Sequence, residues 1–116
     1  MSIIKPEAGE TLIVTGAAGS VGSIVGQMAK ADGMRVIGVV GSDEKADWIV
    51  NTLGFDGAIN YKTDDLESKL AQLTPNGIDA FFENTGGPIQ QHIFARMNAH
   101  GRIAVCGMIA DYTSET

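Results

Sequence analysis

Short buried-strand patterns alternate with helical patterns five times along the chain, and this alternation limits the possible folds more than any other feature. All-apolar runs rich in β-branched residues, TLIVT at Thr11–Thr15 and RVIGVV at Arg35–Val40, are typical of strands buried on both faces. Strands that alternate with helices form a parallel sheet with right-handed crossovers. The sequence therefore predicts an α/β protein, with a doubly wound parallel sheet as the middle of three layers.

Apolar spacing and helix-ending glycines place the next elements. Further strands are predicted at Gly57–Tyr61, Asp79–Glu83 and Arg102–Cys106. The first helix is expected to end at Gly33, since glycine readily adopts the backbone conformation that follows a helix. We expect this helix to pack on the sheet through an apolar stripe that consists of Val21, Ile24, Val25, Met28 and Ala29.

Three more helices are predicted between the later strands. The second helix begins at Asp43, which can cap it, and ends at Gly54. One side of the third helix carries Leu66, Leu70 and Leu73. The fourth helix begins at Pro88, and its apolar side is predicted to consist of Ile89, Ile93, Phe94 and Met97. The complete fold of this type has a sixth strand, which we do not expect within this chain.

Composition limits the possible partners and the compartment. The 116 residues correspond to a single domain, and the net charge of −6 with no basic patch argues against nucleic acid and anionic membranes as partners. No apolar run approaches the ~20 residues of a membrane span. A single cysteine excludes an internal disulfide, so a reducing, cytoplasmic location is expected.

The turn after the first strand reads TGAAGSVGS, from Thr15 to Ser23. A strand that enters a helix through a glycine turn directs the unpaired N–H groups and partial positive charge of the helix start at the sheet edge, where they attract phosphate. In the dinucleotide fingerprint G-x-G-x-x-G, Gly19 and Gly22 occupy the second and third places and Ala17 the first. The pattern predicts a cofactor turn in a Rossmann-type fold, with tight packing as the alternative reason for the glycines.

Other known turn motifs are not met at this position. A phosphate-binding P-loop requires Lys-Ser or Lys-Thr after the glycines, and neither follows. Ser20 is not at a nucleophile elbow, because the pattern G-x-S-x-G is absent. The short-chain dehydrogenase pattern also fails at Ser20, and the chain contains no Y-x-x-x-K.

The second strand lacks the acid that NAD-binding proteins use for the ribose 2′-hydroxyl. Gly41 and Ser42 occupy its expected place, and Lys45 follows one helical turn later. A carboxylate there would repel a 2′-phosphate, whereas glycine and serine tolerate it and a nearby lysine can supply the opposite charge. A solvated surface lysine is the alternative interpretation of Lys45. We expect Asp43 and Glu44 to point into solvent as acids at a helix start. The sequence therefore favours NADP(H) over NAD(H).

Five segments together resemble the medium-chain dehydrogenase/reductases: GETLIVTGAAGSVGSIVGQMAK, VVGSDEK, GFDGAINYKT, PNGIDAFFENTGG and GRIAVCGMIADY. The similarity covers nearly the whole chain. It is greatest to the zinc-independent branch of prostaglandin reductases, leukotriene dehydrogenases and alkenal double-bond reductases, related to quinone oxidoreductases. This resemblance implies hydride transfer from NADPH to α,β-unsaturated ketones or aldehydes, by a parent protein that is a monomer or homodimer.

The resemblance also implies a set of cofactor contacts. The pyrophosphate would lie at Gly19, Ser20, Val21 and Gly22, and the 2′-phosphate near Gly41, Ser42 and Lys45. Tyr61 would contact the adenosine end, Asn84 would lie over the middle of the cofactor, and the nicotinamide side would be lined by Cys106, Gly107, Met108, Ile109 and Tyr112. No cysteine and histidine cluster has metal-ligand spacing, so we expect no metal.

Members of this family are two-domain proteins, so the resemblance implies that residues 1–116 are the NADP-binding domain of a larger reductase. The catalytic domain and the sixth strand would lie outside this chain. We therefore expect the chain to bind cofactor without turning over substrate and to contain no catalytic residue. A non-catalytic NADP(H)-binding regulator, or a structural protein with the same fold, is the alternative.

Overall fold

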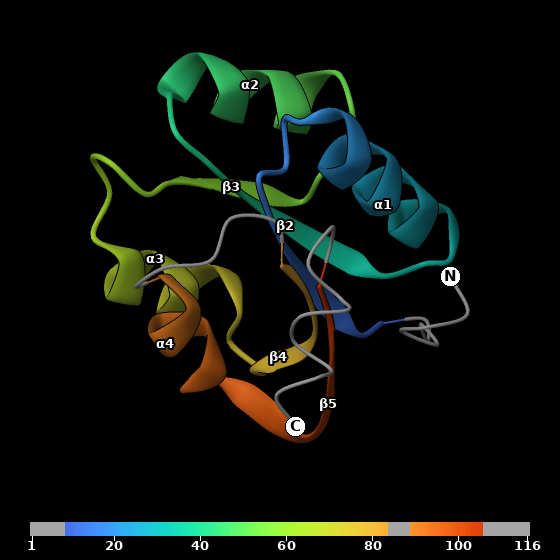
Figure 1. Cartoon of the computed structure of the whole chain (residues 1–116), viewed down its shortest axis with the longest axis vertical. Helices are drawn as coiled ribbons and strands as arrows, with labels where there is room; N and C mark the ends of the chain where they lie inside the picture. Colours follow the sequence, from blue (N-terminus) through green and yellow to red (C-terminus); the bar gives the residue numbers. More distant parts are fainter. Residues whose placement is uncertain (1–8, 84–88, 106–116) are drawn as a thin grey trace.

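The computed structural model describes residues 9–83 and 89–105 of the chain. Strands and helices alternate along these residues (Figure 1). The strands are β1 (Thr11–Thr15), β2 (Arg35–Val40), β3 (Gly57–Asn60), β4 (Ile78–Glu83) and β5 (Met97–Val105). The helices are α1 (Ser20–Ala31), α2 (Asp43–Asn51), α3 (Leu66–Leu73) and α4 (Ile89–Phe94).

The five described strands form one sheet in the order β3-β2-β1-β4-β5, and each neighbouring pair is parallel. The chain therefore builds outward from β1 to β3, crosses the sheet, and continues on the other side of β1 with β4 and β5. This arrangement confirms the predicted doubly wound parallel sheet. Its switch point lies between β1 and β4, where open α/β sheets hold ligands beyond the carboxyl ends of their strands.

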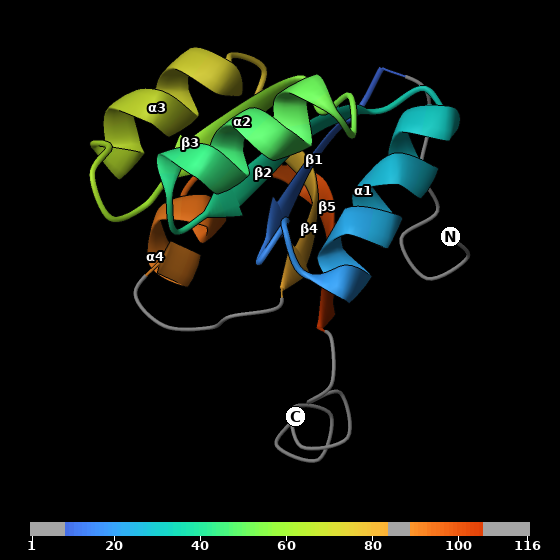
Figure 2. The same ribbon diagram turned by 90° about the horizontal axis from the view of Figure 1, so that it is seen from above.

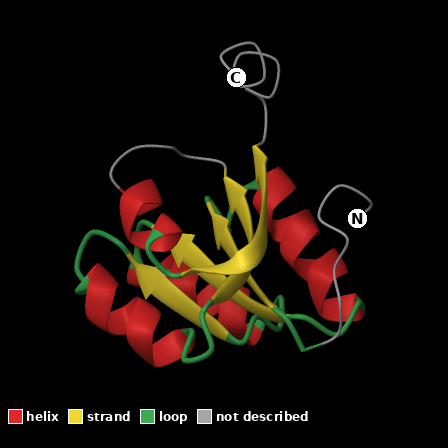
Figure 3. Cartoon of the chain, turned by 90° about the horizontal axis from the view of Figure 1, so that it is seen from below, coloured by secondary structure: helices red, strands yellow, loops and turns green. Residues whose placement is uncertain are grey.

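Helices cover both faces of the sheet (Figure 3). Helices α1 and α2 lie together on one side, and α3 and α4 on the other (Figure 2). Alternate residues of one strand supply the two cores, because successive strand side chains point to opposite faces. Leu12 and Val14 join the core under α1 and α2, whereas Ile13 joins the core under α3 and α4.

Two glycines bring α1, α2 and the sheet unusually close together. A Cβ on Gly26 of α1 would lie 2.0 Å from Cζ of the buried Phe55. A Cβ on Gly38 of β2 would lie 2.4 Å from Cδ1 of Ile49 and 2.7 Å from the Cβ of Ala17. Both glycines therefore leave the space that larger neighbours fill, as close-packed interiors require.

The predicted apolar stripe of α1 was wrong in part: Ala29 is buried and Val25 packs against the core, but the other three residues do not. Val21, Ile24 and Met28 are exposed, and the buried positions of the helix are Gly22, Ser23, Gly26 and Ala29. Small residues predominate on the buried side, and at Gly26 a larger side chain would collide with the buried Phe55. Val21, Ile24 and Met28 lie on the outer side of α1.

Several predicted boundaries differ from the structure, most clearly the start of α2 and the start of β5. Helix α2 is capped by Ser42, whose Oγ accepts a hydrogen bond from the Lys45 backbone N–H, so Asp43 is its first residue rather than its cap. Strand β5 begins at Met97 rather than at Arg102, after a short α4, and a register irregularity opposite Ile78 and Ala80 accommodates the extra length. Met97 therefore belongs to the strand and not to the helix.

Carboxylates stabilise the amino edge of the sheet. Asp56 accepts hydrogen bonds from the Val36 backbone N–H at 2.8 Å and from Lys30 Nζ at 2.9 Å. Asp79 accepts from the Thr11 backbone N–H at 2.9 Å. These acids lie at the opposite edge from the glycine turn.

None of the helices in the described part of the chain has the length and apolar character that a membrane span requires.

Candidate functional site: a basic pocket at the glycine turn

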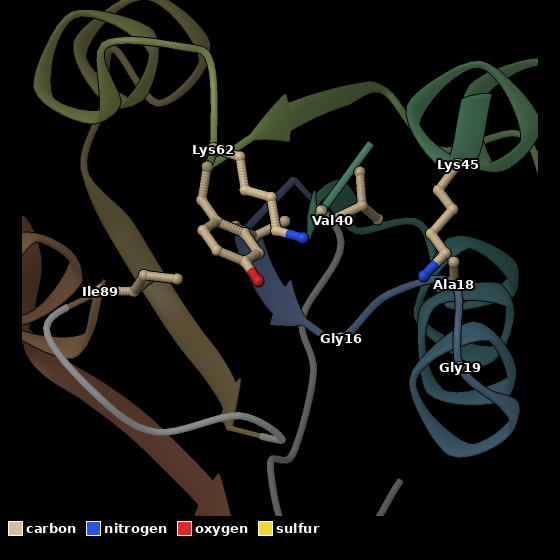
Figure 4. A pocket seen from close by; sticks show the side chains of 10 residues that line it. Gly16, Ala18, Gly19, Val40, Lys45, Lys62 and Ile89 are labelled. Carbon is tan, nitrogen blue, oxygen red and sulfur yellow. The ribbon is translucent and has the colours of Figure 1, made fainter. Parts of the chain in front are cut away.

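A pocket of about 200 Å³ lies at the carboxyl edge of the sheet (Figure 4). It joins the turn after β1, the end of β2, the start of α2 and the turn after β3. Its lining consists of Gly16, Ala18, Gly19, Val39, Val40, Gly41, Lys45, Tyr61, Lys62 and Ile89. The volume is below the roughly 300–1,000 Å³ of pockets for drug-sized ligands, so it suits one part of a dinucleotide.

Gly16 makes the sharp turn that follows β1. Its φ of +61° lies in the left-handed region that favours glycine. The backbone N–H of Gly19 donates to the Gly16 carbonyl at 3.0 Å, while the Ala17 N–H donates to the Val39 carbonyl at the end of β2. The sequence fingerprint placed Ala17 at the turning position. In the structure Gly16 turns the chain, and the buried Ala17 packs into the core.

The N-terminus of α1 receives no side-chain cap from the described residues. Gly19 is its N-cap residue, and its first turn contains no acidic residue. The N-terminus of α2 differs, since Ser42 caps it and Asp43 and Glu44 lie in its first turn. Orphan N–H groups and the helix dipole favour an anion at the first of these two helix starts.

Two lysines reach the pocket from different elements. Lys45 extends from the first turn of α2 toward Ala18 and Gly19, and Lys62 extends from the turn after β3 into the pocket (Figure 4). Neither ammonium group forms an ion pair with another described residue. By contrast, Lys30 pairs with Asp56. The pocket therefore carries uncompensated positive charge on a chain whose net charge is −6.

Gly41 lies where the carboxylate of an NAD-binding protein would be expected. A Cβ at this position would lie 3.4 Å from Cε1 of Tyr61 and 3.5 Å from Cε of Lys62, which are ordinary contacts. Asp43 and Glu44 are exposed, as expected, and Oδ1 of Asp43 also accepts a hydrogen bond from Nδ2 of the buried Asn60 at 2.9 Å. Its carboxylate is therefore bound to the end of β3.

A buried polar pair links the two strands at the switch point. The Thr15 hydroxyl at the end of β1 donates to Oε1 of Glu83 at the end of β4, at 3.2 Å. Thr15 and Glu83 are both almost completely buried. This contact stabilises the relative position of the strand ends from which the glycine turn begins.

The structure brings four of the predicted site residues together around this pocket: Gly19, Gly41, Lys45 and Tyr61. Ser20, Val21 and Gly22 form the first turn of α1, and the Ser42 side chain caps α2. The other predicted residues, Asn84, Cys106, Gly107, Met108, Ile109 and Tyr112, lie outside the described residues.

Six residues of the pocket were not among the predicted site residues: Gly16, Ala18, Val39, Val40, Lys62 and Ile89. Gly16 directly precedes the fingerprint that starts at Ala17, and Lys62 follows Tyr61, to which the resemblance gave a role. Among the described residues, no group of three or more histidine, cysteine, aspartate or glutamate side chains is placed to hold a metal ion.

Comparison with known proteins gives a consistent result. A sequence model of the family described as zinc-binding dehydrogenase matches residues 20–116. The chain is 46% identical over 114 residues to the NADP(+)-dependent 2-alkenal reductase of Nicotiana tabacum and 48% identical over 113 residues to prostaglandin reductase 1 of Rattus norvegicus. Each match covers 97% of this chain, but only 33% and 34% of the relative. The chain thus spans about a third of the length of these relatives.

A solved structure has a closely similar fold. The crystal structure of CurA from Vibrio vulnificus in complex with NADPH superimposes with a TM-score of 0.88 at 43% sequence identity. The match covers 99% of this chain and 34% of CurA. The family description mentions zinc, whereas the described residues contain no zinc-ligand cluster.

Proposed function

The chain belongs to the zinc-binding dehydrogenase family, within the medium-chain dehydrogenase/reductases, and from this premise we propose that it is the NADP(H)-binding domain of a reductase acting on α,β-unsaturated ketones or aldehydes. Its named relatives include an NADP-dependent 2-alkenal reductase and prostaglandin reductases. A 2-alkenal is an α,β-unsaturated aldehyde. The name of the 2-alkenal reductase and the sequence resemblance both indicate α,β-unsaturated carbonyl compounds, and this is the substrate class that we propose.

One observation supports the cofactor assignment most directly. The start of α1 without a side-chain cap, the open position at Gly41 and the Lys45 ammonium, which pairs with no described carboxylate, meet in one pocket. The helix start suits a pyrophosphate, and the lysine beside a strand end without a carboxylate suits a 2′-phosphate. The donor set of this edge therefore fits NADP(H) better than NAD(H).

Each part of the site has a distinct role in this proposal. The N–H groups of Ser20, Val21 and Gly22 would hold the pyrophosphate, and Lys45 would hold the 2′-phosphate. When bound, the cofactor supplies the hydride. The chain's own residues bind it and orient it along the carboxyl edge of the sheet. Thr15 and Glu83 fix the strand ends that define this orientation.

We propose that residues outside this chain complete the reductase. Hydride transfer requires a substrate held against the nicotinamide with water excluded. The described residues form one edge of such a cleft, and the relatives are about three times as long as the region that matches this chain. The chain alone is therefore expected to bind NADPH and to leave enone substrates unreduced.

Calorimetric titration of the chain with NADPH and, separately, with NADH tests the proposal. We expect binding of NADPH that is at least about tenfold tighter than binding of NADH. Circular dichroism on the same sample establishes that the chain is folded. A folded chain that binds both cofactors equally, or neither, would contradict the assignment. Enone reduction by the full-length protein then distinguishes a reductase from a non-catalytic NADP(H)-binding regulator.

Lys45→Ala is expected to weaken NADPH binding by about tenfold to a hundredfold and to change NADH binding by less than about twofold. A charge-assisted hydrogen bond to phosphate contributes roughly 1.5–3 kcal/mol, and NADH lacks the 2′-phosphate. Titration calorimetry of both cofactors measures the two effects. Lys69→Ala, a lysine of α3 outside the pocket, controls for the loss of one positive charge. An equal loss for NADPH and NADH would refute this role of Lys45.

A further inference from the structure

We propose that Lys62 is a second cation of the 2′-phosphate subsite and determines NADP(H) specificity together with Lys45, an inference that rests on the proposed NADP(H) binding. Lys62 lies in the turn after β3, between Asn60 and α3. The sequence pattern around Tyr61 gives Lys62 no role of its own. Its position relative to Gly41, to Lys45 and to the nearby carboxylates supports the proposal.

The Lys62 side chain lies beside the strand end at which cofactor specificity is decided. A Cβ built on Gly41 would lie 3.5 Å from Lys62 Cε, so the end of the lysine stem is in van der Waals reach of the missing acid's position. The Lys62 ammonium is 5.9 Å from the centroid of the Tyr61 ring, near enough for a cation–π attraction. A cation therefore occupies the neighbourhood where an NAD-binding protein has an anion.

Lys62 and Lys45 reach the same pocket from different directions (Figure 4). Lys45 comes from α2 and points toward the glycine turn, whereas Lys62 comes from the opposite side of Val40. A phosphate monoester carries a charge of about −1.5 to −2 at neutral pH. A single lysine would leave much of this charge uncompensated, and a pair of lysines on two sides of the subsite matches it.

The turn that carries Lys62 is fixed by the buried Asn60. Oδ1 of Asn60 accepts a hydrogen bond from the Lys62 backbone N–H at 3.1 Å. Nδ2 of Asn60 donates to Asp43 at 2.9 Å, and its backbone N–H donates to Oδ2 of Asp64 at 2.8 Å. The same residue therefore positions the lysine backbone and engages the two neighbouring carboxylates. Neither carboxylate forms an ion pair with the Lys62 ammonium.

Lys62→Met tests this inference, because methionine keeps an unbranched stem beside Gly41 and removes the charge. Binding is measured by calorimetry with NADPH, NADH and adenosine 2′,5′-bisphosphate. We expect binding of NADPH and of the bisphosphate to weaken by about tenfold, with less than about a twofold change for NADH. Lys62→Arg should retain most of the affinity, and Lys69→Met serves as the matched control outside the pocket.

The outcomes separate this inference from the proposed function. If the wild-type chain prefers NADPH and Lys62→Met binds NADPH as tightly as the wild type does, Lys62 has no role in specificity and only this inference fails. Equal weakening for NADPH and NADH also overturns it, since the 2′-phosphate would not be the group recognised. If the wild-type chain shows no preference for NADPH, the proposed function fails and this inference fails with it.

Discussion

Replacing Gly26 with alanine is expected to lower the free energy of unfolding by about 2–3 kcal/mol. The new Cβ would lie 2.0 Å from Cζ and 2.5 Å from Cε1 of Phe55, distances that force the ring to move. The ring cannot retreat freely, because it also packs near Gly38, where an added Cβ would lie 3.0 Å from Phe55 Cδ2. In an exposed helix the same substitution would stabilise by about 1 kcal/mol. A lower free energy of unfolding, rather than a higher one, would therefore show that Gly26 packs tightly against Phe55.

Urea unfolding followed by circular dichroism measures this effect. Phe55→Leu supplies a smaller partner, so Gly26→Ala should cost less in that background than in the wild type, and the difference isolates the Gly26–Phe55 contact. Gln27→Ala, on the exposed side of the same helix, should change stability by no more than about 0.5 kcal/mol. A Gly26→Ala chain as stable as the wild type would show that α1 does not approach Phe55 this closely.

The sequence was sufficient for the order of the elements because buried parallel strands and helix-ending glycines leave strong local signals. β1 and β2 have the predicted boundaries, Thr11–Thr15 and Arg35–Val40. The direction of α1 was not predictable in the same way. Helical spacing identifies residues that share a side, but in α1 the exposed side carries the large apolar residues Val21, Ile24 and Met28. Close packing against the buried Phe55 selects the side that contains Gly26.

The site could be predicted as far as its residues belong to recognisable patterns. Gly19 belongs to the glycine fingerprint and Gly41 to a strand end without an acid, and both line the pocket. Lys62 belongs to no such pattern. Lys62 is exposed and also lines the pocket; its backbone N–H donates to Asn60, whose side chain also binds Asp43 of α2. Contacts of this kind follow from tertiary structure alone.

Gly41→Asp is expected to reverse the cofactor preference, because it weakens NADPH binding and strengthens NADH binding, whereas either lysine substitution should leave NADH binding nearly unchanged. The backbone at Gly41 is outside the left-handed region, and an added Cβ makes only ordinary contacts, so the aspartate fits without backbone strain. Its carboxylate would repel the 2′-phosphate and can pair with Lys62, which removes a cation from the subsite. NADPH binding should weaken by about 30-fold, or roughly 2 kcal/mol. NADH binding should strengthen, because the carboxylate can accept hydrogen bonds from the ribose hydroxyl.

Gly41→Asn is the matched control, since asparagine has nearly the same shape as aspartate without the charge. Titration of both variants with NADPH and NADH gives the ratio of the two dissociation constants for each. A loss of NADPH affinity for aspartate alone attributes the effect to charge, as the open position beside Lys45 and Lys62 requires. If both variants lose NADPH affinity equally, the cause is steric crowding against Tyr61, and the absence of an acid at the end of β2 does not decide cofactor choice. The comparison thus tests the physical reason for NADP(H) preference separately from the preference itself.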